Sequence, residues 1–139
     1  MKLILLICLM AAAPALKAQT FPEAGNREAQ LQRAQELQKT AADLEEAVRQ
    51  HPESAELYIR LGFAYAKLEK TEEARKAFET AVKLDPKKAI AHYMLGLIYE
   101  KKGMKTEAVA AWKACLESAD EPRLRETARK HLHHLGTNR

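Results

Sequence analysis

The feature that most constrains this chain is an internal repeat with a period of 34 residues. When the sequence is shifted by 34 positions, identical or similar residues superpose without a gap over two consecutive units. The matching pairs are Ala55 with Ala89, Leu61 with Leu95, Gly62 with Gly96, Tyr65 with Tyr99, Phe78 with Trp112 and Ala81 with Cys115. A fixed period of this length is typical of proteins built from stacked copies of one supersecondary unit.

Each unit is expected to consist of two helices. Apolar residues recur at spacings of three and four over residues 55–67 and 89–102, and again in the second half of each unit. Gly62 and Gly96 each cost their helix about 1 kcal/mol relative to alanine. We infer that a missing side chain at these positions lets the two helices of a unit approach closely. The chain has only 5 Gly, 5 Pro and 6% aromatic residues, a composition that argues against an all-β fold.

These residues resemble the pattern of the tetratricopeptide repeat family. The resemblance is carried by the Leu-Gly pairs, the tyrosines that follow them, and the later small and aromatic positions given above. The chain departs from the family at the first aromatic position, where it has Tyr58 and His92 instead of Trp, and at Asp120, where the family has Pro. The resemblance implies an all-α fold, a tetratricopeptide-repeat α-solenoid of stacked helix pairs, with repeats at residues 55–88 and 89–122.

Helical patterns also flank the two repeats. Leu44 stands 34 residues before Phe78, but Glu28 occupies the glycine position, so residues 27–52 fit either one long helix or the helix pair of a partial repeat. At the other end, residues 123–136 are expected to form a capping helix. Such helices would complete the core, because solenoids need covered ends and about three units for stability.

The N-terminus is expected to be a secretory signal peptide. Lys2 precedes an unbroken apolar stretch over residues 3–13, and small residues follow up to Ala18. The apolar stretch is shorter than the roughly 20 residues that a transmembrane helix needs. We therefore predict cleavage of residues 1–18, a linker over residues 19–26, a secreted or periplasmic protein, and no stable membrane insertion after the signal is removed. The alternatives are cleavage after Ala15 and an uncleaved anchor.

Removal of the signal peptide would leave Cys115 as the one remaining cysteine, so no intramolecular disulfide is expected. Cys115 lies on an apolar helical stripe with Trp112 and Leu116. Because free cysteines are among the most buried residue types, we interpret this thiol as a packing residue.

The resemblance also implies where a partner would bind. In the family, the first helices of successive repeats line a concave groove, and the register carries this role onto a mostly apolar set of positions. The predicted groove residues are Ile59, Phe63, Lys67, Ile90, Tyr93, Leu97 and Lys101. The family's clamp for a peptide carboxylate is absent, because Ile59, Phe63 and Met94 replace its polar residues. Alternatively, the N-terminal helix could fold into the groove and bury Phe63, Tyr93 and Leu97 within the chain.

Catalysis and nucleic-acid binding find little support in the sequence. The net charge of +4 is carried in mixed-sign runs, without the basic patch that phosphate contacts require. His131 and His134 have a spacing that could seat a metal on one helical face, but no further ligand is evident, and we interpret them as surface residues. We predict no catalytic residues, no metal site and no cofactor, and conclude that the protein is not an enzyme.

Two functions remain. The first is an exported interaction module, a scaffold or adaptor that binds a protein or peptide partner in the groove. The second is a structural envelope subunit that forms a homo-oligomer through its N-terminal helix.

Overall fold

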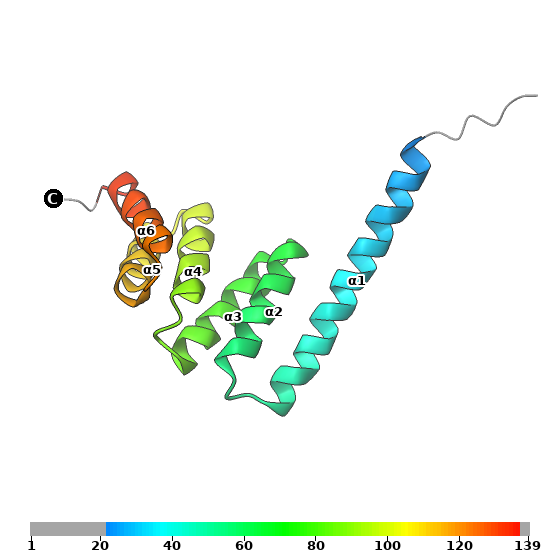
Figure 1. Cartoon of the computed structure of the whole chain (residues 1–139), viewed down its shortest axis with the longest axis horizontal. Helices are drawn as coiled ribbons and strands as arrows, with labels where there is room; N and C mark the ends of the chain where they lie inside the picture. The colour runs from blue at the N-terminus through cyan, green and yellow to red at the C-terminus, as the bar shows by residue number, and fades with distance from the viewer. Residues whose placement is uncertain (1–21, 137–139) are drawn as a thin grey trace, which may run out of the picture.

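The structure is a computed structural model, and it describes residues 22–136. In this part of the chain every regular element is an α-helix (Figure 1). The helices are α1 (Pro22–Gln50), α2 (Ala55–Lys67), α3 (Thr71–Leu84), α4 (Ala89–Lys101), α5 (Lys105–Ser118) and α6 (Pro122–His134). The all-α prediction is confirmed. The predicted signal peptide lies outside the described residues.

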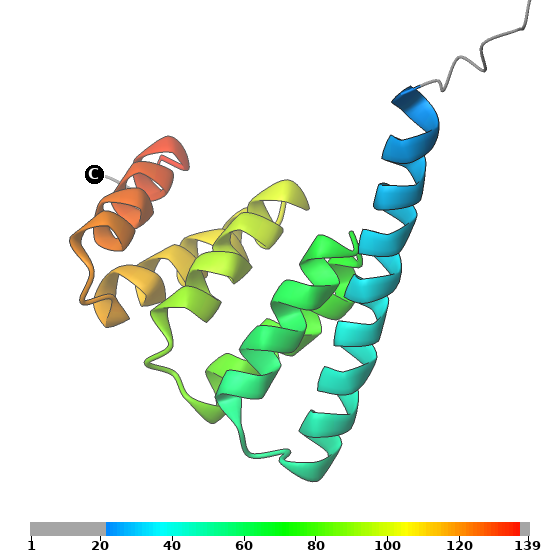
Figure 2. The same ribbon diagram turned by 45° about the vertical axis from the view of Figure 1, so that its right-hand side comes forward.

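The helices stack in chain order, each against the next, as Figures 1 and 2 show. α2 pairs with α3, and α4 pairs with α5. The helices within these two pairs contact each other more extensively than any other helices in the structure. The pairs then stack through α3 and α4. This is the α-solenoid expected from a repeated helix pair, because each unit buries its apolar face against its neighbours.

Glycine allows the close approach within each pair. A Cβ atom added to Gly62 would lie 2.7 Å from Cζ of Phe78, and one added to Gly96 would lie 2.5 Å from Cε2 of Trp112. Both rings are fully buried. The aromatic ring of the second helix therefore rests on the bare backbone of the first helix, and the predicted close approach of the two helices is confirmed.

α1 is a single helix of 29 residues, so the alternative of a helix pair in this segment is wrong. The predicted linker over residues 19–26 is also wrong in its second half, because the helix already begins at Pro22. Proline fits the first helical position, where its missing N–H has no partner to lose. Gly25 is tolerated within the helix at a cost of about 1 kcal/mol.

The second half of α1 replaces the second helix of a preceding repeat. Ala41 and Leu44 are buried in a cluster with residues of α2 and α3. The Tyr65 hydroxyl donates a 2.7 Å hydrogen bond to Glu45 of α1, and 34 residues later Tyr99 donates a 2.6 Å bond to Glu79 of α3. The same contact thus joins both second helices to the first helix that follows them.

The first half of α1 extends beyond the end of α2 as an arm, which Figures 1 and 2 show from two sides. Leu31 in this arm is 58% exposed, and every described side chain from residue 25 to 36 is exposed except the half-buried Ala29. The apolar stripe of α1 therefore continues past the surface that covers it.

α6 closes the other end of the stack. Ala128 and Leu132 are buried with Trp112 and Cys115 of α5. Arg125 fixes the turn before α6 by donating hydrogen bonds to the backbone carbonyls of Leu116, at 2.9 Å, and of Ala119, at 3.2 Å. The predicted capping helix is thus present, although it runs from Pro122 to His134. No helix within residues 22–136 has the length and apolar character needed to cross a membrane.

Candidate interaction surface

The first helices α2, α4 and α6 place equivalent residues on one side of the stack. The 34-residue register relates Phe63 of α2 to Leu97 of α4, and the same step leads on to His131 of α6. Lys67 and Lys101 are related in the same way at the ends of α2 and α4. We name the face that carries these positions the first-helix face.

Ile59 does not belong to this surface, and the prediction that it lines the groove is wrong. Its side chain is only 4% exposed and lies in the main core cluster with Phe78, Ala91 and Leu95. This cluster joins residues of α2, α3 and α4. A large aliphatic side chain at the contact between two stacked repeats is used to hold them together and cannot meet a partner.

Phe63 and Tyr93 are half-buried, and each makes an edge contact with a buried ring. The centroids of Phe63 and Phe78 are 5.3 Å apart at an interplanar angle of 84°, and those of Tyr93 and Trp112 are 5.4 Å apart at 81°. Edge-to-face pairs of this geometry add about 0.5–1.5 kcal/mol beyond the area they bury. The two rings therefore support the core while part of each remains accessible.

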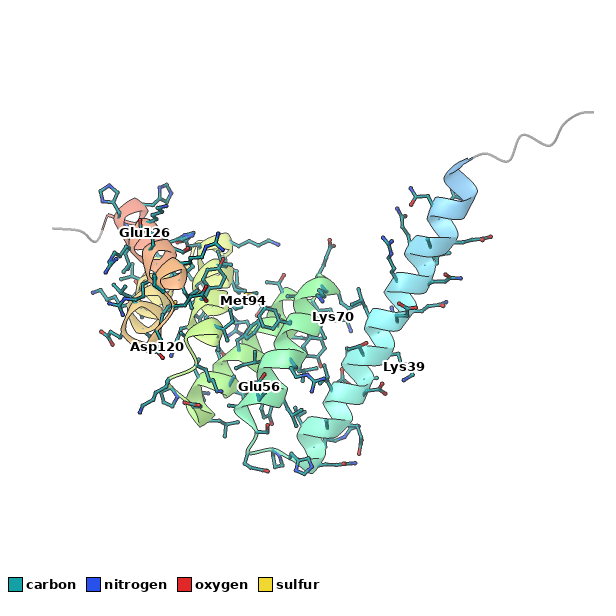
Figure 3. All side chains as sticks on the ribbon, in the orientation of Figure 1. Lys39, Glu56, Lys70, Met94, Asp120 and Glu126 are labelled. Atoms are coloured by element: carbon teal, nitrogen blue, oxygen red, sulfur yellow. The ribbon has the colours of Figure 1, made fainter. Side chains whose placement is uncertain are left out.

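The other predicted groove residues differ in exposure. Leu97 is half-buried against the cluster around Trp112, whereas Ile90 is 38% exposed. Lys67 and Lys101 are exposed, and neither has an ion-pair partner among the described residues. Side chains fill the space between α2 and α4, where Figure 3 labels Met94. The accessible floor is thus narrower than predicted.

α1 does not fill the first-helix face, so the self-occluded alternative is wrong for the described residues. Its buried residues pack with Leu61, Ala64 and Ala77 instead. Phe63, Tyr93 and Leu97 belong to the other two clusters, which contain no residue of α1. Lys39, labelled in Figure 3, stands on the side of α1 away from the solenoid.

A polar cluster on α4, α5 and α6 extends the surface, and the sequence did not indicate that its members come together. The Glu100 carboxylate accepts a 2.8 Å hydrogen bond from Nε1 of Trp112 and bonds of 2.9 and 3.0 Å from Nδ1 of His131. The His131 ring also stacks on Trp112, with centroids 4.2 Å apart and an interplanar angle of 15°. The helix that carries His131 was predicted as a cap, but the interpretation of His131 as a surface residue is wrong, because its ring stacks on Trp112.

Next to this cluster is an open depression of about 360 Å³ lined by Glu100, Lys130, His131 and His134. A second one, of about 200 Å³, adjoins it and is lined by Glu100, Gly103, Lys105, His134 and Leu135. Both lie where the C-terminal ends of α4 and α6 come together.

The arrangement offers little for catalysis or metal binding. No group of three or more His, Cys, Asp or Glu side chains within residues 22–136 is placed to hold a metal ion. His131 uses Nδ1 to bind Glu100. Burial raises the pKa of the Cys115 thiol to about 11, so this group is not a thiolate at neutral pH and is a poor nucleophile.

Comparison with known proteins identifies the repeats. A family model described as a TPR repeat matches residues 64–103, and one described as a tetratricopeptide repeat matches residues 89–122. No curated protein sequence matches the chain.

Among solved structures, the crystal structure of MamA is similar, with a TM-score of 0.55 and 25% sequence identity. The match covers 68% of this chain and 64% of the MamA chain, so this chain spans less than two thirds of that protein. Tetratricopeptide repeats are in general scaffolds for protein partners and carry no catalytic groups of their own. The chain contains tetratricopeptide repeats, which stack into an all-α solenoid and indicate a protein-interaction module.

Proposed function

We propose that this protein is exported and that it binds a peptide or helix of another protein across its first-helix face. The apolar part of the site consists of Ile90 with the accessible edges of Phe63, Tyr93 and Leu97. Lys67 and Lys101 form its polar rim.

The observation that carries this proposal is the exposure of apolar side chains on a face that the chain does not cover. Ile90 is 38% exposed, and the three residues beside it in the proposal are half-buried. α1, the segment that could have covered them, packs elsewhere. Exposed apolar side chains on one face are typical of interaction sites, and a helix laid in a groove would use them through residues one turn apart.

The groove is tested by introducing charge at exposed positions that differ only in location. Ile90→Glu should abolish capture of the partner from an envelope extract, because a carboxylate would be buried in the interface. Leu84→Glu is the matched control: Leu84 is 42% exposed at the end of α3, outside the proposed site. Loss of capture in both variants, or in neither, would refute the groove.

The double substitution of Phe63 and Tyr93 with Ala should also abolish capture while helical content stays nearly intact. The edge contacts of both rings mean that the melting temperature will fall. Circular dichroism at the temperature of the capture experiment therefore has to accompany it. If the variant is unfolded at that temperature, these two rings act as core residues and the binding surface lies elsewhere.

Export rests on the apolar N-terminal stretch, which lies outside the described residues. N-terminal sequencing of the protein recovered from its cells should give a chain that begins at Gln19. A chain that still begins at Met1 would contradict export without affecting the groove.

A second candidate function is a structural subunit that self-associates through α1. The arm of α1 favours it, because Leu31 is 58% exposed there. Sedimentation of the wild-type protein and of Leu31→Glu distinguishes the two functions. A larger species that Leu31→Glu reduces to a monomer would support self-association, whereas a monomer in both cases would leave the groove as the function.

A further inference from the structure

α6 docks on the stack through different polar contacts from those of α2 and α4. Tyr65 of α2 and Tyr99 of α4 each donate a hydrogen bond to a glutamate of the preceding second helix. By register, His133 takes the place of these tyrosines in α6, and Lys113 takes the place of the glutamates in α5. These two residues cannot repeat a hydrogen bond from a phenol to a carboxylate, so α6 is held in another way.

The polar contact that joins α6 to α4 is the pair of His131 and Glu100. Nδ1 of His131 lies 2.9 and 3.0 Å from the two oxygens of Glu100, and only 21% of the Glu100 side chain is exposed. Because an ionised carboxylate can only accept hydrogen bonds, Nδ1 carries a proton whenever this bond exists. The proton that His131 gains or loses near neutral pH is therefore the one on Nε2.

A proton on Nε2 strengthens two contacts of His131 at once. The hydrogen bond to Glu100 becomes an ion pair between two partly buried side chains. The ring also becomes a cation on the face of Trp112, which it already covers at a centroid distance of 4.2 Å, and an indole face attracts cations. Both contacts join α6 to other helices, so they exist only while α6 is docked.

The other charges around His131 are exposed and do not replace this contact. The charged or titratable residues that line the two depressions beside it are Glu100 of α4, Lys105 of α5, and Lys130 and His134 of α6. The cations among them oppose a further proton on His131, and Glu126, 3.8 Å from Lys130, offsets part of their charge. Within residues 22–136, the one ion-pair partner of Glu100 is His131. Since salt screens exposed charges much more than partly buried ones, the direct contact with Glu100 dominates.

We propose that α6 is a pH-sensitive cap, which docks most firmly when His131 is protonated and Glu100 is ionised. The docked state binds the proton on Nε2 better than the open state, so docking becomes tighter as the pH falls through the range in which histidine titrates. This contribution is complete in mildly acidic solution and is lost as the pH rises past about 6.5. It is lost again below about pH 4, where carboxylates become neutral.

Opening of α6 uncovers the part of the second repeat that it protects. Trp112 and Cys115 of α5 are fully buried, in one cluster with Ala128 and Leu132 of α6. α6 also carries the last position of the first-helix face. The pH therefore sets how firmly this end of the solenoid is closed, whether or not a partner is bound to the face.

Cys115 provides the measurement, because its thiol is fully buried and can react only after the structure around it opens. The protein is treated with N-ethylmaleimide, and modification is followed by mass spectrometry on the peptide that contains Cys115. At a given pH the thiol of the open state has the same reactivity in every variant, so the ratio of two rates compares how often they open. Amide hydrogen exchange in α2 should be unchanged, which distinguishes opening of α6 from loss of the whole fold.

His131→Phe keeps an aromatic ring beside Trp112 but removes the pair with Glu100. It should react about tenfold faster than the wild type at about pH 5.5, and by a clearly smaller factor at about pH 8.5, where the neutral ring forms the weaker contact. A ratio that is the same at both pH values would overturn the proposal.

Two further variants keep the test decisive if His131→Phe folds poorly. Glu100→Gln retains an acceptor for Trp112 and removes the charge, so it should also react faster than the wild type, with the larger factor at the lower pH. His134→Gln removes an exposed histidine of the same helix and should match the wild type at both pH values. Equal effects of His134→Gln and His131→Phe, or an effect of Glu100→Gln that does not depend on pH, would contradict the assignment to the pair of Glu100 and His131.

Discussion

The two repeats share one framework and differ on the face that the framework presents. In both, a buried ring of the second helix rests on a glycine of the first, and in both a tyrosine donates a hydrogen bond to a glutamate of the preceding second helix. On the first-helix face, however, Ile59 is buried whereas its equivalent Tyr93 is partly accessible. The contact within each repeat and the hydrogen bond to the preceding helix are therefore the same, whereas the position shared by Ile59 and Tyr93 differs in exposure.

The larger buried ring in the second repeat explains why only this repeat has a polar cluster on its first helix. Phe78 has no polar atom, whereas the indole of Trp112 needs an acceptor when buried and finds it in Glu100. The equivalent of Glu100 in the first repeat is Ala66. Glu100 in turn binds His131 of α6. The second repeat thus carries the contacts that fix the capping helix, and the first repeat has no need of them.

Removal of the two buried rings should have the largest effect. Phe78→Ala and Trp112→Ala should each lower the free energy of unfolding by about 3–5 kcal/mol, which is a large share of the roughly 5–15 kcal/mol of a typical domain. Trp112→Ala should in addition release α6, because it removes the surface on which His131 stacks. Denaturant unfolding measures the first effect, and amide hydrogen exchange over residues 122–134 measures the second. If the amides of α6 are equally protected in Phe78→Ala and Trp112→Ala, the second repeat does not fix the capping helix through Trp112.

Filling the space at the glycines should have the next largest effect, and it should be similar in the two repeats. Gly62→Leu and Gly96→Leu should each destabilise the protein by about 1–3 kcal/mol through overpacking against a buried ring. Gly25→Leu is the control, since a Cβ atom there meets nothing within 4 Å. Thermal melts of Gly62→Leu and wild type that coincide would mean that the helices do not approach closely at this point.

Substitutions in the turn between the two helices of each repeat should change the melting temperature by less, and with opposite signs in the two repeats. Glu69 and Gly103 are equivalent by register and both have positive φ, 60° and 71°. A non-glycine residue pays about 1–2 kcal/mol for this conformation. Glu69→Gly should therefore raise the melting temperature, by an amount reduced by the greater chain entropy of glycine when unfolded, and Gly103→Ala should lower it. If Glu69→Gly is destabilising, the left-handed geometry is not strained there.

Removal of the hydroxyl groups of the equivalent residues Tyr65 and Tyr99 should have the smallest effect on stability at neutral pH. Burial, and then the hydrogen bond to Glu45 or Glu79, raises the pKa of Tyr65 and Tyr99 to about 12, from the ordinary value of 10.0. Because the neutral phenol is favoured in the folded state, this stabilisation is complete below about pH 10 and is lost as the pH rises towards 12. Tyr65→Phe and Tyr99→Phe should each cost about 1 kcal/mol at neutral pH. In an alkaline absorbance titration, each substitution should remove one tyrosine whose pKa lies above the ordinary value of 10.0.

Short-range patterns predicted the repeat, its helix ends near Lys67 and Lys101, and the close approach of the two helices at each glycine, because these depend on residues that a helix pair brings together locally. α1 begins at Pro22, five residues before the predicted start at residue 27, and it includes Gly25. Proline is compatible with a first turn, and the cost of one glycine is small in a helix of this length.

The sequence by itself thus determined the solenoid, since a 34-residue period with apolar residues at helical spacing can bury its apolar faces only by stacking. Tertiary structure decided which side of each first helix is left for a partner. Ile59 and Tyr93 occupy the same register position. The packing of the neighbouring helices nevertheless buries Ile59 and leaves Tyr93 partly accessible. The pairing of Glu100 with His131, 31 residues apart, likewise depends on where α6 docks. Register fixes the direction of a side chain, but its exposure depends on the neighbour that packs over it.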